Sequence, residues 1–417
     1  MNGAFEDTLH YTSPAHGGWG MVRIGMLVPE SVQLFVCPFA CGRHGAIGAM
    51  RQGFKDRLAY LYVDQNDIVR GYDDQIPGAV EELLDALPRR PRVVLIFLSC
   101  LDDLIGTDRE ALLEVLHGRF PDLRFRICHM NPISLDSKSP PPVTIRRRIY
   151  SLLEPSETKE TSVNSIGNLE AVAPECELHR VLEGLGAGEL RHISRCRTFE
   201  EFQRMASSRA NLVLAPTGVQ AAKEMERALG IPFLLLPVSY RIGEIEAGYR
   251  QLRDFLDPSG AEPDLSAKRA AALRAVEAAL RAVGDRPVIV DASAVTRPFG
   301  LARALLEYGF SVRRVVAQKC IPIDRKSLDW LEENRPDVEL VQPQHHRAVR
   351  FEGRLAEALA IGVDGAYLAG ARHVVDLFAD GALFGFHGLR VLMERMRAAA
   401  EAETDLERLI ESYGLVV

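Results

Sequence analysis

The sequence predicts an α/β protein made of three doubly wound, Rossmann-like parallel-sheet domains around a central cleft. Its apolar runs of strand length, such as Val93–Ser99, are continuous rather than alternating, which is typical of parallel strands buried on both faces. Segments of helical period separate these runs along the chain. The length of 417 residues supports two or three domains, at about 150 residues per domain. We expect an α/β domain at residues 1–155, a middle α/β domain at 156–260, and a third at 261–417.

The composition and charge exclude several classes of protein. The hydrophobic share of 47% and the charged share of 26% are ordinary for a globular chain and exclude a disordered or collagen-like one. A net charge of −7 excludes nucleic-acid binding that depends on bulk positive charge. No apolar run reaches about 18 residues, and the first residues lack a basic region followed by an apolar core. We therefore expect a cytoplasmic protein without membrane contact, in which disulfides are rare and the seven cysteines need another explanation.

The first domain is expected to alternate strands and helices up to residue 129. The expected strands are Val32–Cys37, Leu58–Val63, Val93–Ser99 and Arg124–His129, and the expected helices are Gly45–Phe54, Pro77–Leu87 and Asp108–His117. The Pro- and Ser-rich stretch Leu135–Pro142 is expected to be a turn or crossover loop. The basic run Arg146–Arg148 is expected to form a solvated face. The polar stretch Glu154–Thr161 is expected to be a linker.

Two further alternations follow the linker. The second has expected strands at Val163–Gly167, Leu190–Ser194, Leu212–Ala215 and Phe233–Val238, with helices at Glu177–Leu185, Phe199–Ala206 and Val219–Leu229. The Ala/Arg-rich stretch Leu265–Val283 is expected to be a long bridging helix. The third has expected strands at Val288–Asp291, Val312–Ala317, Val338–Gln342 and Gly365–Leu368, with helices at Gly300–Tyr308, Lys326–Glu333, Gly353–Leu359 and Leu389–Ala400.

Three cysteines fall at strand-to-loop junctions of the first domain. Cys37 and Cys100 end strands, and Cys41 follows Cys37 just before a helix. Because ligand sites of parallel sheets lie at the carboxyl ends of the strands, these thiols are candidate ligands for zinc or an iron–sulfur cluster. A free cysteine can equally serve as a small buried hydrophobe. We assign that packing role to Cys176, Cys196 and Cys320, which have no partner at ligand spacing, and leave Cys128 open.

Several motifs resemble the nitrogenase component 1 family. The run Cys100–Asp108 resembles that family's Cys-x3-Leu-Ile-Gly-Asp-Asp segment, whose cysteine binds an iron–sulfur cluster. Upstream, Asp67–Asp74 resembles an Asp-Ile-Val-Phe-Gly-Gly segment, and Cys37–Gly42 resembles a Gly-Pro-x-Gly-Cys turn, which matches Cys41 to a second ligand. Further likenesses in order along the chain are Asn211–Ala215, Leu229–Pro232, Pro287–Asp291 and Phe384–Gly388.

The departures from this family pattern are also informative. Trp19 stands where the family has its first cluster cysteine, and Cys37 stands at a position that is usually glycine and could replace it. Ala215 aligns with the cysteine that binds the large nitrogenase cofactor, and no histidine falls near Val375, the matching histidine position. The chain is therefore more similar to compact nitrogenase-like proteins, such as the tetrapyrrole reductases, than to dinitrogen-reducing nitrogenases.

The resemblance implies an iron–sulfur oxidoreductase subunit that takes part in electron transfer. By it, Cys37, Cys41 and Cys100 would hold a [4Fe-4S] cluster as metal and cofactor ligands. Asp102, Asp103, a second subunit or solvent would complete the open iron position. An ATP-dependent iron protein would deliver electrons, the chain would form a homodimer or a heterodimer with a related subunit, and a small molecule, a tetrapyrrole among the candidates, would be reduced.

The catalytic residues are unknown at this level, and two other functions remain open. His44 and His129 are the histidines nearest in sequence to the cysteine edge and are candidate proton donors, although each could simply satisfy a local hydrogen bond. The first alternative function is a non-catalytic scaffold for metal-cofactor assembly. The second is a metal-free multi-domain α/β binding protein or transferase, against which no G-x-G-x-x-G loop is present.

Overall fold

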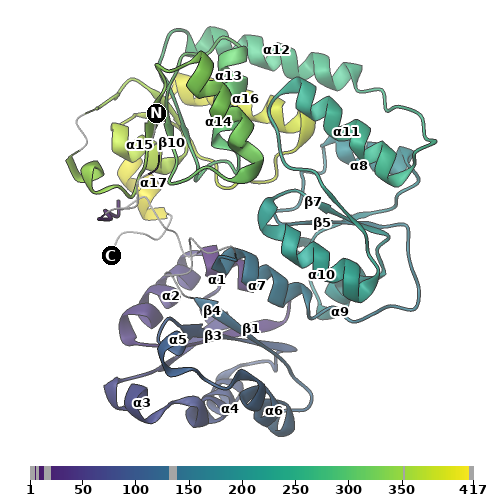
Figure 1. The fold of residues 1–417 in the computed structure, drawn as a ribbon, viewed down its shortest axis with the longest axis vertical. Coiled ribbons are helices and arrows are strands. Elements are labelled where there is room, and N and C mark those ends of the chain that lie inside the picture. Colours follow the sequence, from purple (N-terminus) through teal and green to yellow (C-terminus); the bar gives the residue numbers. More distant parts are fainter. Residues whose placement is uncertain (1–4, 6–8, 14–19, 131–138, 351–352, 413–417) are drawn as a thin grey trace. The chain divides into compact units, whose positions relative to one another are not determined.

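The computed structural model describes residues 5, 9–13, 20–130, 139–350 and 353–412 of the 417-residue chain. Within them the chain forms two compact units, residues 19–171 with 190–235, and residues 1–18 with 172–189 and 236–417. Figure 1 labels the elements of both. The described strands form three sheets, and every strand pair is parallel. The predicted fold class, α/β with three doubly wound parallel sheets, is confirmed. The domain boundaries near residues 155 and 260 stay a prediction.

The first sheet has the strand order β2-β1-β3-β4. Its strands are β1 (Ser31–Cys37), β2 (Leu58–Tyr62), β3 (Val93–Ser99) and β4 (Arg124–Met130). Helices α1 (Gly20–Met26), α2 (Phe39–Arg51) and α7 (Pro141–Tyr150) cover one face, and α4 (Ile76–Ala86) and α6 (Arg109–Arg119) cover the other. The short helices α3 (Gln65–Arg70) and α5 (Asp102–Ile105) follow β2 and β3. Since β1 is flanked by β2 and β3, the chain reverses its winding direction between β1 and β3.

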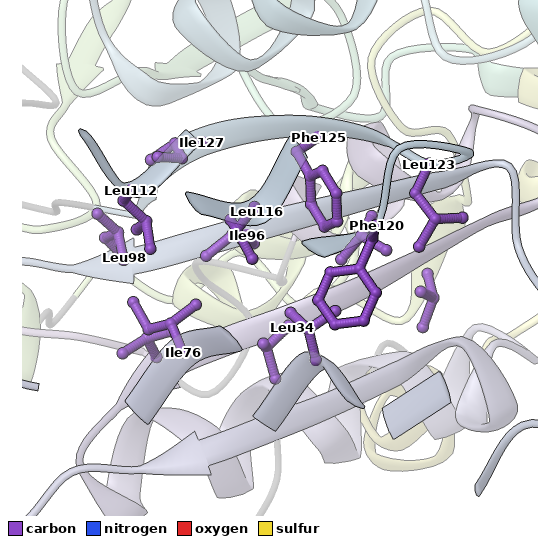
Figure 2. Packing of buried hydrophobic residues seen from close by; sticks show 14 of the residues in the cluster. Leu34, Ile76, Ile96, Leu98, Leu112, Leu116, Phe120, Leu123, Phe125 and Ile127 are labelled. Atoms are coloured by element: carbon purple, nitrogen blue, oxygen red, sulfur yellow. The ribbon is translucent and has the colours of Figure 1, made fainter. Parts of the chain in front are cut away.

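The face under α4 and α6 is a continuous apolar core. Alternate residues of the strands point into it, including Leu34, Ile96 and Phe125, and Leu112 and Leu116 of α6 pack against them (Figure 2). Ile96 and Phe125 are fully buried. Burying a side chain of this size contributes about 1.5–3 kcal/mol each, so this face holds the strand register firmly. It thereby fixes where the carboxyl end of each strand lies.

The second sheet has the order β6-β5-β7-β8. Its strands are β5 (Val163–Ile166), β6 (Leu190–Arg191), β7 (Ala210–Val213) and β8 (Phe233–Leu235), with α9 (Phe199–Gln203) and α10 (Val219–Leu229) between them. At its winding reversal, between β5 and β7, a Cβ atom on Gly167 would lie 2.5 Å from the Ala215 carbonyl oxygen. Glycine at position 167 therefore allows the two chain segments to touch.

The third sheet has the order β11-β10-β9-β12-β13 and lies in the other compact unit. Its strands are β9 (Val288–Asp291), β10 (Val312–Val316), β11 (Glu339–Val341), β12 (Leu359–Ile361) and β13 (His373–Val375). The helices of this unit are α8 (Glu177–Gly184), α11 (Ile242–Leu256), α12 (Ser266–Val283), α13 (Pro298–Glu307), α14 (Arg325–Asn334), α15 (Val363–Ala369), α16 (Gly385–Glu401) and α17 (Leu406–Ser412). The predicted bridging helix, α12, packs along α16. Among the described helices, none is long and apolar enough to cross a membrane.

Several local predictions are wrong. The helix expected at Gly353–Leu359 is a loop that leads into β12, and the strand expected at Gly365–Leu368 lies inside α15. Both are short apolar runs whose period does not separate helix from strand. The helix expected from Gly45 begins earlier, at Phe39, so Cys41 lies inside α2 rather than before it. Helices α7, α11 and α17 and strand β13 were not predicted. The first half of the loop expected at Leu135–Pro142 lies outside the described residues, and its last two residues begin α7.

The basic run in α7 is not one solvated face. Arg146 is buried, and its guanidinium donates to the Pro142 carbonyl at 3.0 Å. Burial lowers the pKa of Arg146 to about 10. Arg147 is half-buried and Arg148 is exposed. Successive residues of a helix point in different directions, so a run of like residues on α7 cannot share one face.

Candidate cysteine site at the carboxyl edge of the first sheet

Two of the predicted ligands flank the winding reversal of the first sheet. Cys37 is the last residue of β1, and Cys100 follows the last residue of β3. The strands β1 and β3 are neighbours in register, with Val36 opposite Leu98. In doubly wound sheets, ligands bind outside the carboxyl ends of the strands at such a reversal. The chain therefore places both thiols at the position where this fold holds its ligands.

The third predicted ligand is brought to the same edge by close packing of α2. Cys41 is the third residue of this helix and is half-buried. A Cβ atom on Gly42 would lie 2.4 Å from the Tyr60 ring of β2, and one on Gly45 would lie 2.7 Å from the Phe35 ring of β1. These glycines let the helix rest directly on the strands. The two glycines therefore let the part of α2 that carries Cys41 pack directly against the sheet.

The three thiols influence one another electrostatically. Burial, followed by the nearby Cys41, raises the pKa of the Cys37 thiol to about 12. Burial and the Cys100 thiol also raise the pKa of Cys41. If all three thiols were ionised, their negative charges would repel one another. A metal bound here would therefore displace the thiol protons and supply the compensating positive charge. The positive end of the α2 dipole favours the thiolate form at Cys41.

The three sulfurs are not grouped as the donors of one metal ion would be. Among the described residues, the sulfurs of Cys37, Cys41 and Cys100 do not form a set lying within 4.8 Å of one another, which one tetrahedral zinc ion would require. A cluster carries its ligands on different iron atoms and therefore spaces them farther apart. Trp19, which stands in place of the first family cysteine, lies outside the described residues.

The two candidate proton donors have different surroundings. His44 lies on α2, half-buried, with its Nδ1 2.7 Å from the Ala40 carbonyl oxygen. This contact assigns the proton to Nδ1 and is the local hydrogen bond expected of a structural histidine. His129, the next-to-last residue of β4, faces the buried carboxylate of Asp102, with 3.8 Å between Nδ1 and Oδ2. Burial, followed by Arg109, lowers the pKa of His129, so its imidazole is neutral near pH 7.

His129 and Asp103 line an open cavity that sequence reasoning did not identify. The cavity has a volume of about 250 Å³. It lies between the carboxyl end of β4 and α7, and its titratable lining groups include Asp103, Arg109, His129, Arg147 and Arg148. Asp102 has no exposed side-chain surface and binds Arg109 through Oδ2, at 3.2 Å. The signal available in the sequence was that Asp102 closely follows one strand and His129 lies near the end of the next, and the sheet order makes these two strands neighbours.

Comparison with known proteins identifies the family. The family model for nitrogenase component 1 type oxidoreductases matches residues 18–401 of the chain. The chain belongs to this family. The solved structure "Nitrogenase Cp1 at pH 6.5" is 16% identical, with a TM-score of 0.71, and the match covers 95% of this chain and 94% of that one. "Nitrogenase Cp1 at pH 5" is 14% identical, with a TM-score of 0.67, covering 96% and 89%. No curated protein sequence matches the chain.

Membership of the nitrogenase component 1 family confirms the predicted resemblance, and this family binds iron–sulfur clusters. The two positions that the sequence comparison matched to ligands of the large cofactor are Ala215 and Val375. Ala215 lies two residues after the end of β7, and its backbone contacts Gly167. Val375 is the last residue of β13 and is buried. Neither an alanine nor a valine side chain has a donor atom for a metal.

The remaining cysteines lie away from the three thiols or are closed off. Cys128 is buried on β4, and burial raises its pKa to about 12, so its thiol is protonated. Cys176 is buried and approaches the Phe384 carbonyl at 3.5 Å. Cys196 and Cys320 are half-buried near the second and third sheets. Their surroundings agree with packing roles.

Proposed function

We propose that the chain is a subunit of a nitrogenase-like reductase that holds a [4Fe-4S] cluster through Cys37, Cys41 and Cys100. In this proposal a separate ATP-dependent iron protein delivers the electrons, and a small-molecule substrate is reduced. The observation that carries the proposal is the convergence of three thiols on the winding reversal of one sheet, in a chain of this family. The cytoplasm, where thiols stay reduced, is the compartment that suits such a site.

The residues of the chain have distinct tasks in this proposal. When bound, an iron–sulfur cluster supplies one-electron storage and transfer. Cys37 would hold it from the sheet and Cys41 from the first turn of α2, where the helix dipole favours the negative charge. Cys100 would hold it from the loop after β3. His129 holds its neutral imidazole beside the Asp102 carboxylate, which would stabilise the imidazolium form when His129 takes up a proton.

Exposed apolar side chains near this edge support the proposed partners. Phe39 begins α2 and is 57% exposed, Tyr62 ends β2 and is 55% exposed, and Leu104 in α5 is 84% exposed. All three follow the carboxyl ends of β1, β2 or β3. Clustered exposed apolar residues mark interaction surfaces on soluble proteins. A second subunit, identical or related, is the occupant we propose for this surface, because burial would shield the cluster from solvent.

The ligand assignment can be tested by iron analysis. After purification without oxygen, the wild-type chain is expected to contain iron and sulfide and to show the visible absorption of a [4Fe-4S] cluster. Cys41→Ala and Cys100→Ala should each lose most of the iron. Cys320→Ala is the matched control, because Cys320 is also half-buried but lies near the third sheet. A colourless, iron-free wild-type protein would overturn the proposal, and unchanged iron in both variants would overturn the ligand assignment.

Electron transfer separates a reductase from a scaffold for cofactor assembly. An ATP-dependent iron protein, supplied with MgATP and a reductant, should reduce the cluster, and the correct substrate should reoxidise it. Tetrapyrroles are the first substrate class to test, because the family members without the large cofactor include tetrapyrrole reductases. A cluster that no iron protein reduces, in a chain that instead passes metal to another protein, would assign the scaffold function.

A further inference from the structure

A second group of potential metal ligands lies beside the cysteine edge. Asp102 and Asp103 begin α5, directly after β3, and His129 is near the end of β4. The strands pair in register, with Leu98 opposite His129. As a result, one ligand atom from each of the three residues lies within 4.8 Å of the others. Two carboxylates and one imidazole at this separation are a donor set of the kind that encloses a single metal ion.

Two of these residues have buried polar atoms without a hydrogen-bond partner. Asp102 has no exposed side-chain surface, yet within the described residues its Oδ1 accepts no hydrogen bond. The Nε2 atom of His129 is likewise buried and without a partner in the described part of the chain. Leaving a polar atom buried and unsatisfied costs about 1–3 kcal/mol. Buried groups of this kind call for an explanation, and a metal ion bound among these side chains is one.

The other oxygen of Asp102 has the contact expected of a metal-binding carboxylate. Its Oδ2 accepts from the Arg109 guanidinium at 3.2 Å. Arg109 therefore orients the Asp102 side chain through Oδ2, while Oδ1 makes no such contact. Carboxylates that bind metals are commonly hydrogen-bonded through their second oxygen in this way.

The arginines of the adjacent cavity limit what can bind there. Arg147 is compensated by Glu224, at 3.5 Å, whereas Arg148 is exposed and makes no ion pair with the described residues. The charge of a divalent ion would be balanced by Asp102 and Asp103. The added charges of Arg109 and Arg148 then favour an anion, such as a carboxylate, as a further ligand from the cavity side.

We propose that Asp102, Asp103 and His129 bind one divalent transition-metal ion, distinct from the thiol-bound cluster, with its open coordination positions facing the arginine-lined cavity. Mixed carboxylate and imidazole ligands suit Mn²⁺, Fe²⁺ or Zn²⁺, whereas Mg²⁺ and Ca²⁺ prefer oxygen alone. Three protein ligands leave room for a bound anion, as in catalytic metal sites. The proposal uses none of the three thiols and stands whether or not the cluster is present.

Manganese titration of the full-length protein tests this site. Free Mn²⁺ is followed by its electron paramagnetic resonance signal, and the wild type is expected to bind one ion per chain. Asp103→Asn and His129→Gln should each weaken binding at least about tenfold, and Asp102→Asn should abolish it, because each removes a direct ligand. Glu110→Gln is the matched control, since Glu110 is an exposed acid beside Arg109. Cys41→Ala should keep the site while losing the cluster.

Three results would overturn the proposal. Binding that survives all three ligand substitutions would identify adventitious surface ions. Binding lost in Cys41→Ala but kept in Asp103→Asn would place the manganese at the thiols. If the wild type binds no stoichiometric manganese, the Asp102 carboxylate serves as a partner of the buried Tyr72 hydroxyl instead. Burial, followed by the charge of Asp102, raises the pKa of Tyr72 to about 12. Asp103 is exposed, so Asp103→Asn should fold and keeps the test decisive if Asp102→Asn does not.

Discussion

The first and third sheets each reverse their winding direction once, but different kinds of residue lie at the two reversal points. In the first sheet, the reversal between β1 and β3 is lined by Cys37 and Cys100, and the Asp102 oxygen without a partner lies next to it. In the third sheet, the reversal lies between β9 and β12 and is closed by Asp291. The two Asp291 oxygens accept from the Ser293 and Gly365 backbone N–H groups, both at 2.8 Å. A Cβ atom on Gly362 would lie 2.7 Å from the Asp291 Cβ, so the chain packs tightly against Asp291 at this point.

The hydrogen-bond partners of a buried carboxylate indicate its role. Acids of the third-sheet unit hold the ends of chain segments. Asp324 accepts from the N–H groups of Phe299 and Gly300, both at 2.9 Å, at the start of α13. By contrast, the Oδ1 atom of Asp102, beside the first sheet, accepts no hydrogen bond from a backbone N–H group of the described residues. A buried carboxylate whose partners are all backbone N–H groups stabilises the fold, whereas one with an unpaired oxygen is available for a ligand.

The comparison is tested most strongly by removing a structural acid. Asp324→Ala should lower the free energy of unfolding by about 3–5 kcal/mol, because it leaves two buried N–H groups and the nearby Arg297 without their partner. Urea denaturation at pH 7 would measure this. Asp329→Ala is the matched control: Asp329 forms an exposed pair with Arg325, so its loss should cost less than about 1 kcal/mol. Equal losses in both variants would contradict the structural role of Asp324.

The pH dependence of stability is the second test. Burial, followed by the charge of Asp364, raises the pKa of Asp291 to about 6 from the ordinary value of 3.8. The folded protein therefore binds an additional proton between pH 4 and 6, and the stability from this proton is lost as the pH rises through 6. The slope from one such group is at most about 1.4 kcal/mol per pH unit.

Asp291→Asn isolates this contribution from those of other acids. Urea midpoints of wild type and variant at pH 4.5 and 7 should show that the wild type loses more stability between the two values than the variant does. Equal losses would mean that Asp291 titrates normally and that the third-sheet reversal is not closed as described.

The smallest effect is expected at the first sheet. In metal-free protein, Asp102→Asn should change the free energy of unfolding by less than about 1 kcal/mol, because Oδ1 has no hydrogen bond to lose and Arg109 is 41% exposed and stays hydrated. Urea denaturation in the presence of a chelator measures this. A loss of about 3 kcal/mol or more would place Asp102 in the same structural class as Asp324 and end the contrast between the two sheets.

Long buried runs were predictable from the sequence, and short ones were not. Strand β3 and helix α10 have the predicted limits, because a seven-residue apolar strand and an eleven-residue amphipathic helix each show a clear period. The segment from 353 to 369 was predicted with helix and strand exchanged. Strand β12 has only three residues, and its identity comes from pairing with β9 and β13 rather than from its own pattern.

The candidate site was predictable in part. Cys37, Cys41 and Cys100 were chosen because thiols at strand ends share one edge of a parallel sheet, and the structure brings them to the same reversal point. Their role as cluster ligands stays a prediction. The grouping of Asp102, Asp103 and His129 was not predicted, because it depends on β3 and β4 being neighbours in a particular register.

By itself, the sequence determined the family and the three parallel sheets, because these follow from the order of motifs along the chain and from periodicity. It also singled out Cys37, Cys41 and Cys100 as candidate metal ligands, which stays a prediction. Only the tertiary structure decided which buried carboxylates have a hydrogen-bond partner for each oxygen. Asp291 and Asp102 both follow or end a buried strand, and nothing local separates them. A backbone N–H group from the distant helix α15 reaches one oxygen of Asp291, and the nearby Ser293 N–H reaches the other. At Asp102 an imidazole from the neighbouring strand approaches one oxygen, and the other has no partner among the described residues.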